Sequence, residues 1–147
     1  MTHPFAKLTR CALLPLMLTT LAALPAHAKR VAPTTFCTLV GSFTQGARTS
    51  EFSWELRIIE RSTSYSQKLR GDMSDEYGNA VINGNCTQMN SGSKICTFAK
   101  NYTSGQSKGA TFYYSGKVID DQINGRWGYT RGNYNGGTFT AQALDCE

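Results

Sequence analysis

Histidine is scarce in this sequence. The chain has two, His3 and His27, and both fall within the first 28 residues. Residues 1–28 are predicted to be a secretory signal peptide, because a basic start and an apolar stretch lead to a small-x-small cleavage motif at 26–28. Cleavage after Ala28 would leave no imidazole, which excludes Ser-His-Asp and Cys-His catalysis.

Long apolar runs and strong charge are lacking too. After residue 28 no stretch approaches the roughly 20 apolar residues of a membrane helix, so we expect no membrane span. That part keeps 13 of the 15 basic residues and all 10 acidic ones, which gives a formal charge of +3 rather than +5. Such a mild excess favours solubility and does not argue for a nucleic-acid partner. The predicted location is periplasmic or secreted.

Helical periodicity and proline are also missing from this part of the chain. Its only proline is Pro33, and no run of ten or more residues spaces its apolar side chains as a helix does. Apolar and polar residues alternate instead, as around Phe52 and Trp54, which is typical of half-buried strands. The same alternation predicts that Trp127 and Tyr129 both belong to the core.

Turn motifs rich in Gly, Asn, Asp and Ser divide the chain into about eight short strands. They are expected at residues 35–43, 51–60, 63–72, 78–86, 94–102, 110–119, 122–130 and 137–144. Evenly spaced short strands favour an all-β antiparallel meander, and eight can close into a small β-barrel without exposed edges. A two-sheet β-sandwich would give nearly the same pattern. The predicted organisation is a signal peptide over 1–28, a flexible tail over 29–34 and one barrel domain over 35–147.

Four cysteines remain after the predicted signal peptide, and an even number in a small exported domain indicates disulfides. Cys86 and Cys96 flank a polar loop with the spacing of one hairpin, whereas Cys37 and Cys146 would join the first strand to the last. We therefore favour Cys86–Cys96 with Cys37–Cys146 among the three possible connectivities. A metal site is disfavoured, because the cysteine spacings do not suit one and no histidine is left to help.

Three segments near the C-terminus follow one another in a pattern of strand and turn motifs that is also found in known barrels. They read YSGKVI at 114–119, INGRW at 123–127 and GGTFTA at 136–141. A strand with a glycine, a hairpin, a Gly-x-Trp motif and a Gly-rich turn follow one another, which resembles the last hairpins of small up-and-down barrels of the avidin and lipocalin kind. The resemblance covers about thirty residues, and it implies a closed barrel whose mouth holds a small ligand.

Binding of a small apolar ligand inside the barrel is the leading hypothesis for function. The residues expected to line the ligand are Trp54, Tyr114, Trp127 and Phe139. A small eight-stranded barrel can hold one small molecule or be filled by its own side chains. Two glycines on opposing strands, Gly116 and Gly125, would leave room inside or merely relieve the curvature of the barrel.

A protein-binding module, such as an inhibitor of a secreted or host enzyme, is the alternative hypothesis. A rigid, disulfide-closed barrel suits that task because its loops are preorganised. The expected contact is the loop between the second and third cysteines of the domain. Its contact residues would be Gln88, Met89, Asn90 and Lys94.

Catalytic, cofactor and metal motifs are weak throughout. Asp72, Asp75 and Glu76 cluster in one predicted turn, where carboxylates more often satisfy the turn backbone or face water than form a catalytic pair. No cofactor motif is present. The sequence therefore predicts a protein that is not an enzyme, without cofactor or metal.

Overall fold

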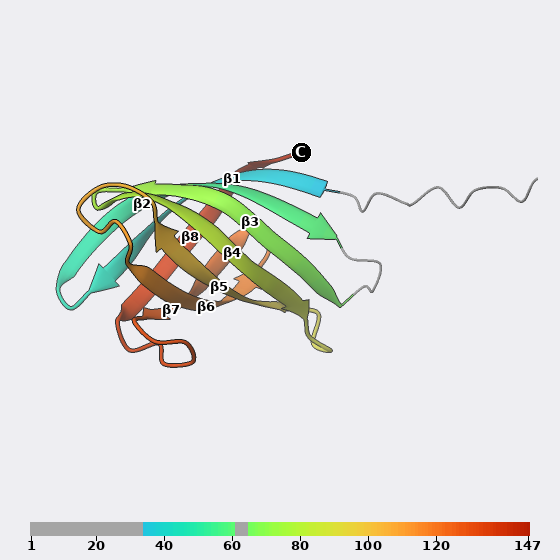
Figure 1. Ribbon diagram of the computed structural model, residues 1–147. Helices are drawn as coiled ribbons and strands as arrows, with labels where there is room; N and C mark the ends of the chain where they lie inside the picture. Colours follow the sequence, from blue (N-terminus) through green and yellow to red (C-terminus); the bar gives the residue numbers. More distant parts are fainter. Residues whose placement is uncertain (1–33, 61–64) are drawn as a thin grey trace, which may run out of the picture. The chain divides into compact units, whose positions relative to one another are not determined.

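The computed structural model describes residues 34–60 and 65–147, and they form a closed, antiparallel, up-and-down barrel (Figure 1). The eight strands are β1 Thr34–Gln45, β2 Arg48–Glu60, β3 Ser66–Asp75, β4 Gly78–Gln88, β5 Lys94–Tyr102, β6 Thr111–Ile119, β7 Gln122–Gly128 and β8 Gly137–Cys146. The predicted signal peptide and all but the last residue of the predicted tail lie outside the described residues. Thr34 already belongs to β1.

Each strand pairs with its neighbours in sequence, and β8 pairs with β1 to close the ring. The all-β barrel prediction is confirmed, and the architecture is the one that the resemblance to avidins and lipocalins implied. The sandwich alternative is excluded because one sheet closes on itself. No helix in the described part of the chain is long and apolar enough to cross a membrane.

The cysteine pairing is also as predicted. Cys37 bonds to Cys146, which lies directly opposite it where β1 meets β8. Cys86 bonds to Cys96 across the β4–β5 hairpin. One bridge therefore fastens the seam that closes the barrel, and the other fastens one hairpin within it.

Two local predictions were wrong. The strand expected at 63–72 is Ser66–Asp75 and ends three residues later than expected, because Asp72 is an ordinary outward-facing strand residue rather than part of a turn. Residues 63 and 64 of the expected strand lie outside the described residues. Tyr129 was expected in the core, yet it is 54% exposed, because β7 ends at Gly128 and the inward alternation stops there. The first error ended a strand too early, and the second extended the alternation past the end of a strand.

Aromatic side chains fill the interior of the barrel. The ring centroids of Trp54 and Phe98 are 4.8 Å apart, and Phe98 stacks on Tyr114 at the same centroid distance. The ring of Phe139 occupies the space beside the paired glycines Gly116 and Gly125, where an added Cβ would lie 2.8 and 2.6 Å from it. These glycines therefore make room for a side chain of the protein.

Candidate binding site at the barrel mouth

Four chain connections meet at one end of the barrel, which we call the mouth. They are residues 45–48, 75–78, 102–111 and 128–137. A pocket of about 150 Å³ lies there, and seven of its nine lining residues are aromatic. The lining residues are Phe43, Gln45, Tyr77, Tyr102, Ser107, Phe112, Tyr114, Trp127 and Tyr129. A pocket with this lining offers ring faces to a ligand and a few polar groups to orient it.

Trp127 forms a fixed wall of the pocket. Its indole Nε1–H donates a hydrogen bond to the carbonyl oxygen of Thr44 at 2.9 Å, and the residue is 3% exposed. Gly136 lies against the indole so closely that an added Cβ would come within 2.6 Å of the ring. Phe112 meets it edge to face, with 5.7 Å between ring centroids. The indole is therefore preorganised before any ligand arrives.

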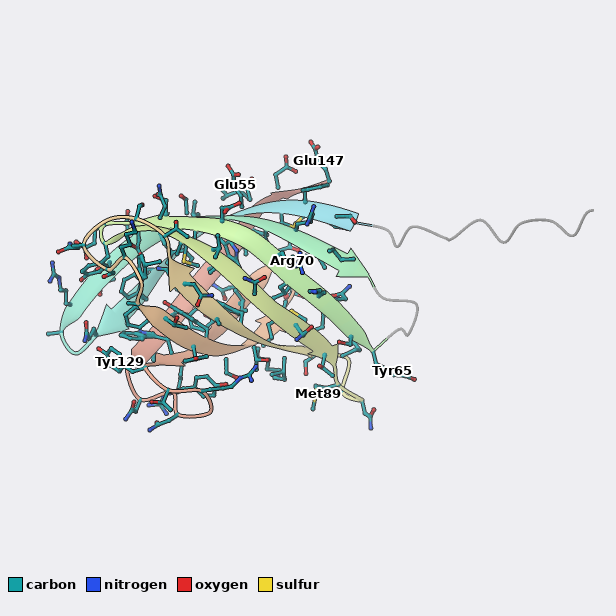
Figure 2. The ribbon with its side chains drawn as sticks, viewed as in Figure 1. Glu55, Tyr65, Arg70, Met89, Tyr129 and Glu147 are labelled. Atoms are coloured by element: carbon teal, nitrogen blue, oxygen red, sulfur yellow. A yellow bond between two sulfur atoms is a disulfide. The ribbon has the colours of Figure 1, made fainter. Side chains whose placement is uncertain are left out.

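Tyr129 forms the solvent-facing rim of the pocket. Its ring lies 5.4 Å from that of Trp127, and its hydroxyl accepts a hydrogen bond from the Gln45 side-chain amide at 2.5 Å. Figure 2 shows Tyr129 at the mouth end of the barrel, and Tyr65 and Met89 at the opposite end. The rim is thus the part of the pocket that an arriving molecule meets first.

The β5–β6 connection packs on the β3–β4 turn and covers one side of the mouth. The Ser107 N–H donates to the Tyr77 carbonyl, and the Asn79 N–H donates to the Ser104 hydroxyl at 3.1 Å. Gly105 has a φ of 75°, and a Cβ there would lie 2.2 Å from the Tyr77 oxygen. Glycine at this position is what allows the two connections to approach each other.

A buried ion pair lies directly behind the aromatic lining. Lys100 projects inward from β5 with 0% exposure, and its ammonium group donates to the Asp75 carboxylate. The Tyr102 hydroxyl donates to the same carboxylate oxygen at 2.5 Å, and the Tyr77 N–H donates to the other at 2.8 Å. The Lys100 ammonium also lies 4.5 Å from the centroid of the Tyr102 ring.

Burial sets the proton affinities in this cluster. Loss of hydration lowers the pKa of Lys100, and the hydrogen bond and charge of Asp75 oppose that shift. Burial also raises the pKa of Tyr102 far above its ordinary value, and the hydrogen bond to Asp75 adds to the effect. Tyr102 therefore stays a hydroxyl donor, and its ring is held in the pocket wall by the carboxylate behind it.

Sequence reasoning missed this cluster, although the signal was present. Cys96, Phe98, Lys100 and Tyr102 alternate along β5 on the inward face, so Lys100 occupies a core position. A lysine at such a position requires a buried carboxylate, since an unpaired buried charge is costly. Asp75 supplies it from the last position of β3.

The predicted ligand-lining residues are all buried, but they divide into two groups. Tyr114 and Trp127 line the mouth pocket. Trp54 and Phe139 lie in the packed interior, at 1% and 4% exposure, and neither lines the mouth pocket. The structure therefore brings two of the four to a pocket. It adds Ser107 from the β5–β6 connection, which sequence reasoning had not placed there, and it puts Tyr129 at the rim of the pocket rather than in the core.

The four predicted loop residues also fall into two groups, two that are exposed and two whose side chains make hydrogen bonds. Met89 is 46% exposed at the end opposite the mouth. Asn90 is exposed as well. Gln88 turns back to donate to the Gly92 carbonyl, and the Lys94 ammonium donates to Gln67 at 3.1 Å. Met89 and Asn90 are thus presented to solvent, whereas the other two brace the loop.

In the described residues no three Cys, His, Asp or Glu side chains converge as metal ligands. Comparisons of the chain with protein-family models, with curated proteins and with solved structures found no match. The mouth pocket and its surroundings are therefore the basis for inferring a function.

Proposed function

We propose that this chain is an exported, non-enzymatic binding protein that holds a small, largely apolar ligand in its mouth pocket. The observation that carries the proposal is the hollow of about 150 Å³ with seven aromatic lining residues. Pockets of this composition bind small molecules by ring contacts and use a few polar groups for orientation. Gln45 and Ser107 supply such groups here.

The volume limits the ligand to about the size of one ring. Sites for drug-sized ligands enclose roughly 300–1,000 Å³, which is well above the volume at this mouth. The rings that fill the interior oppose deeper entry, because Trp54, Phe98 and Tyr114 already contact one another there. The ligand would therefore lie at the mouth, against Trp127 and Tyr129, with part of it in solvent.

The two disulfides support export, since such bonds persist in oxidising compartments. The predicted signal peptide agrees with a periplasmic or extracellular location. A non-enzymatic role is consistent with the absence of histidine after residue 28, because no imidazole is then available as a general base.

Ligand-observed NMR with a mixture of one-ring compounds tests the proposal. Ser107→Trp should fill the pocket and abolish saturation transfer to the compounds that bind wild-type protein. Tyr129→Ala should weaken it by removing a ring from the rim. Tyr65→Ala is the matched control, because Tyr65 is 65% exposed at the opposite end of the barrel. Equal binding to wild type and Ser107→Trp would overturn the proposal.

A protein-binding role for the β4–β5 loop remains the second candidate, and one observation favours it. The Met89 N–H donates to the Ser93 carbonyl and the Gly92 N–H donates to the Met89 carbonyl, so the loop is internally braced. The Cys86–Cys96 bridge holds its base. An exposed methionine on a preorganised loop is suited to insertion into a partner.

The two candidates separate by mutation. Replacing Met89 and Asn90 by alanine should leave binding of one-ring compounds unchanged, and it should abolish inhibition of any secreted enzyme that the wild-type protein inhibits. Ser107→Trp should have the reverse effect. Inhibition that survives the loop variant would exclude the loop as the contact surface.

A further inference from the structure

The outer face of β8 and β1–β4 carries a groove of about 770 Å³, which shares no lining residue with the mouth pocket. Two rows of side chains cross it at right angles to the strands. The first row holds Phe36, Arg57, Arg70 and Asn83, each directly opposite the next on neighbouring strands. Figure 2 shows Arg70 and Glu55 on this outer face.

The second row has the opposite charge. Asp145, Thr38, Glu55 and Asp72 are opposite one another in register, two residues along the strands from the first row. Two residues of an extended strand span about 7 Å. The groove therefore presents a basic row and an acidic row about 7 Å apart.

Two pairs of like charges lie directly opposite each other across β2 and β3. Arg57 is paired in register with Arg70, and Glu55 with Asp72. Like charges in that relation destabilise a sheet, whereas exchanging one residue of each pair would give two favourable pairs. In the described residues the ion pairs are Arg48 with Glu76 and Lys100 with Asp75, so none of these four side chains takes part in one.

We propose that the groove binds a small zwitterion, with an oxyanion group at Arg57 and Arg70 and an ammonium group at Glu55 and Asp72. Two guanidinium groups side by side can donate hydrogen bonds to a tetrahedral oxyanion such as a phosphate ester. The carboxylate row repels a simple anion and attracts the ammonium end. The like-charge pairs, which cost stability in the free protein, become paired when such a ligand is bound.

Titration with three probes of one skeleton tests the zwitterion requirement. The probes are 3-aminopropyl phosphate, propyl phosphate and propylamine, and binding is followed by chemical shifts of the backbone and the arginine Nε–H groups. We expect 3-aminopropyl phosphate to bind about two- to fivefold more tightly than propyl phosphate, because an exposed ion pair contributes about that much. Equal binding of the two phosphates would overturn the proposal.

Two double variants separate the roles of the rows. Arg57→Gln with Arg70→Gln should abolish binding of both phosphates. Glu55→Gln with Asp72→Asn should improve binding of propyl phosphate and remove the advantage of 3-aminopropyl phosphate. Retained phosphate binding in the Arg57→Gln, Arg70→Gln variant would contradict the assignment. So would an unchanged ratio of the two phosphate affinities in the Glu55→Gln, Asp72→Asn variant.

A matched control removes the same amount of positive charge elsewhere. Lys117 and Arg126 are exposed on β6 and β7, outside the groove, and Lys117→Gln with Arg126→Gln should leave the binding of all three probes unchanged. Weakening in this variant equal to that of the arginine variant would reduce the effect to net charge and overturn the proposal.

The zwitterionic group can come from a free molecule or from a lipid headgroup. Sedimentation with phosphatidylethanolamine vesicles distinguishes the two sources. Co-sedimentation that is lost in the Arg57→Gln, Arg70→Gln variant identifies a headgroup. Binding of 3-aminopropyl phosphate without co-sedimentation identifies a free ligand. Binding to neither probe nor vesicles would refute the site.

Discussion

Asp75→Asn tests the account of the buried ion pair. The side chains of Lys100 and Asp75 are both 0% exposed. Asparagine keeps one acceptor oxygen, which can serve the Tyr102 hydroxyl or the Tyr77 N–H but not both, because these groups donate to different carboxylate oxygens. The substitution therefore removes the charge that compensates Lys100, together with one acceptor oxygen. Breaking a buried pair in this way costs about 3–5 kcal/mol, a large part of the roughly 5–15 kcal/mol that stabilises a typical domain.

Urea unfolding with the disulfides intact measures this cost. Arg48→Gln is the matched control, because it breaks an ion pair with Glu76 whose side chains are 68% and 44% exposed. An exposed pair is worth about 0–1 kcal/mol, so the control should unfold near the wild-type midpoint. An Asp75→Asn variant whose free energy of unfolding lies within about 1 kcal/mol of wild type would refute the claim that Lys100 and Asp75 form a buried, coupled pair.

The pH dependence gives a second check with a definite sign. Burial lowers the pKa of folded Lys100 below that of an unfolded lysine. The unfolded state therefore binds more protons between the two values, and this group makes stability rise with pH in that interval. Removal of the Asp75 charge should make the free energy of unfolding rise more steeply with pH, because the folded Lys100 ammonium loses the carboxylate that opposes the lowering of its pKa. Adding Lys100→Met should abolish this steeper pH dependence. The Asp75→Asn, Lys100→Met double variant should also lose about 0.5–3 kcal/mol less unfolding free energy than the two single variants together.

Three other predictions follow from the fold. Removing the β1–β8 disulfide by double Cys→Ala substitution should cost about 2 kcal/mol more unfolding free energy than removing the β4–β5 disulfide, because the bridges close loops of 109 and 10 residues. Urea unfolding compares the two variants, and equal costs would contradict the chain-entropy argument. Gly125→Ala should destabilise the barrel by about 1–3 kcal/mol, because the new Cβ would lie 2.1 Å from the Ser115 carbonyl oxygen; an unchanged melting temperature would show that this part of the wall can shift. Burial, with a further contribution from Asp75, raises the pKa of Tyr102 and of Tyr114 above about 10, so the unfolded state releases protons first and stability should fall as pH rises past 10. Absorbance at 295 nm should show two tyrosines that ionise only on unfolding, and Tyr102→Phe should flatten the alkaline loss of stability.

The strand order and both disulfides could be predicted because they depend on local signals. Alternation, turn residues and cysteine spacing located the strands, and a bond between the first and last strands indicated closure. The exact ends of the strands were harder to predict. Asp75 was assigned to a turn whose backbone its carboxylate would satisfy, and the carboxylate does accept from the Tyr77 N–H. What the sequence did not reveal is that Asp75 is also the last residue of β3 and pairs with buried Lys100.

The contents of the interior could not be predicted, because they depend on the shapes of side chains from all eight strands together. Trp54 and Phe139 were expected around a ligand, since large aromatic residues can line a cavity or fill it. The structure places Phe139 in the space beside two glycines, so its ring fills the room that those glycines leave. The pairing of Arg57 with Arg70 also depended on register, which the sequence pattern leaves undetermined.

The two tryptophans provide the most direct test of the mouth pocket. Trp127 lines that pocket, whereas Trp54 is 1% exposed in the packed interior. In a ¹H–¹⁵N spectrum each indole N–H gives its own signal. A one-ring compound that binds as proposed should shift the Trp127 signal and leave the Trp54 signal unchanged. A shift confined to Trp54, or bound ligand with neither signal moved, would contradict the claim that this barrel holds its ligand at the mouth.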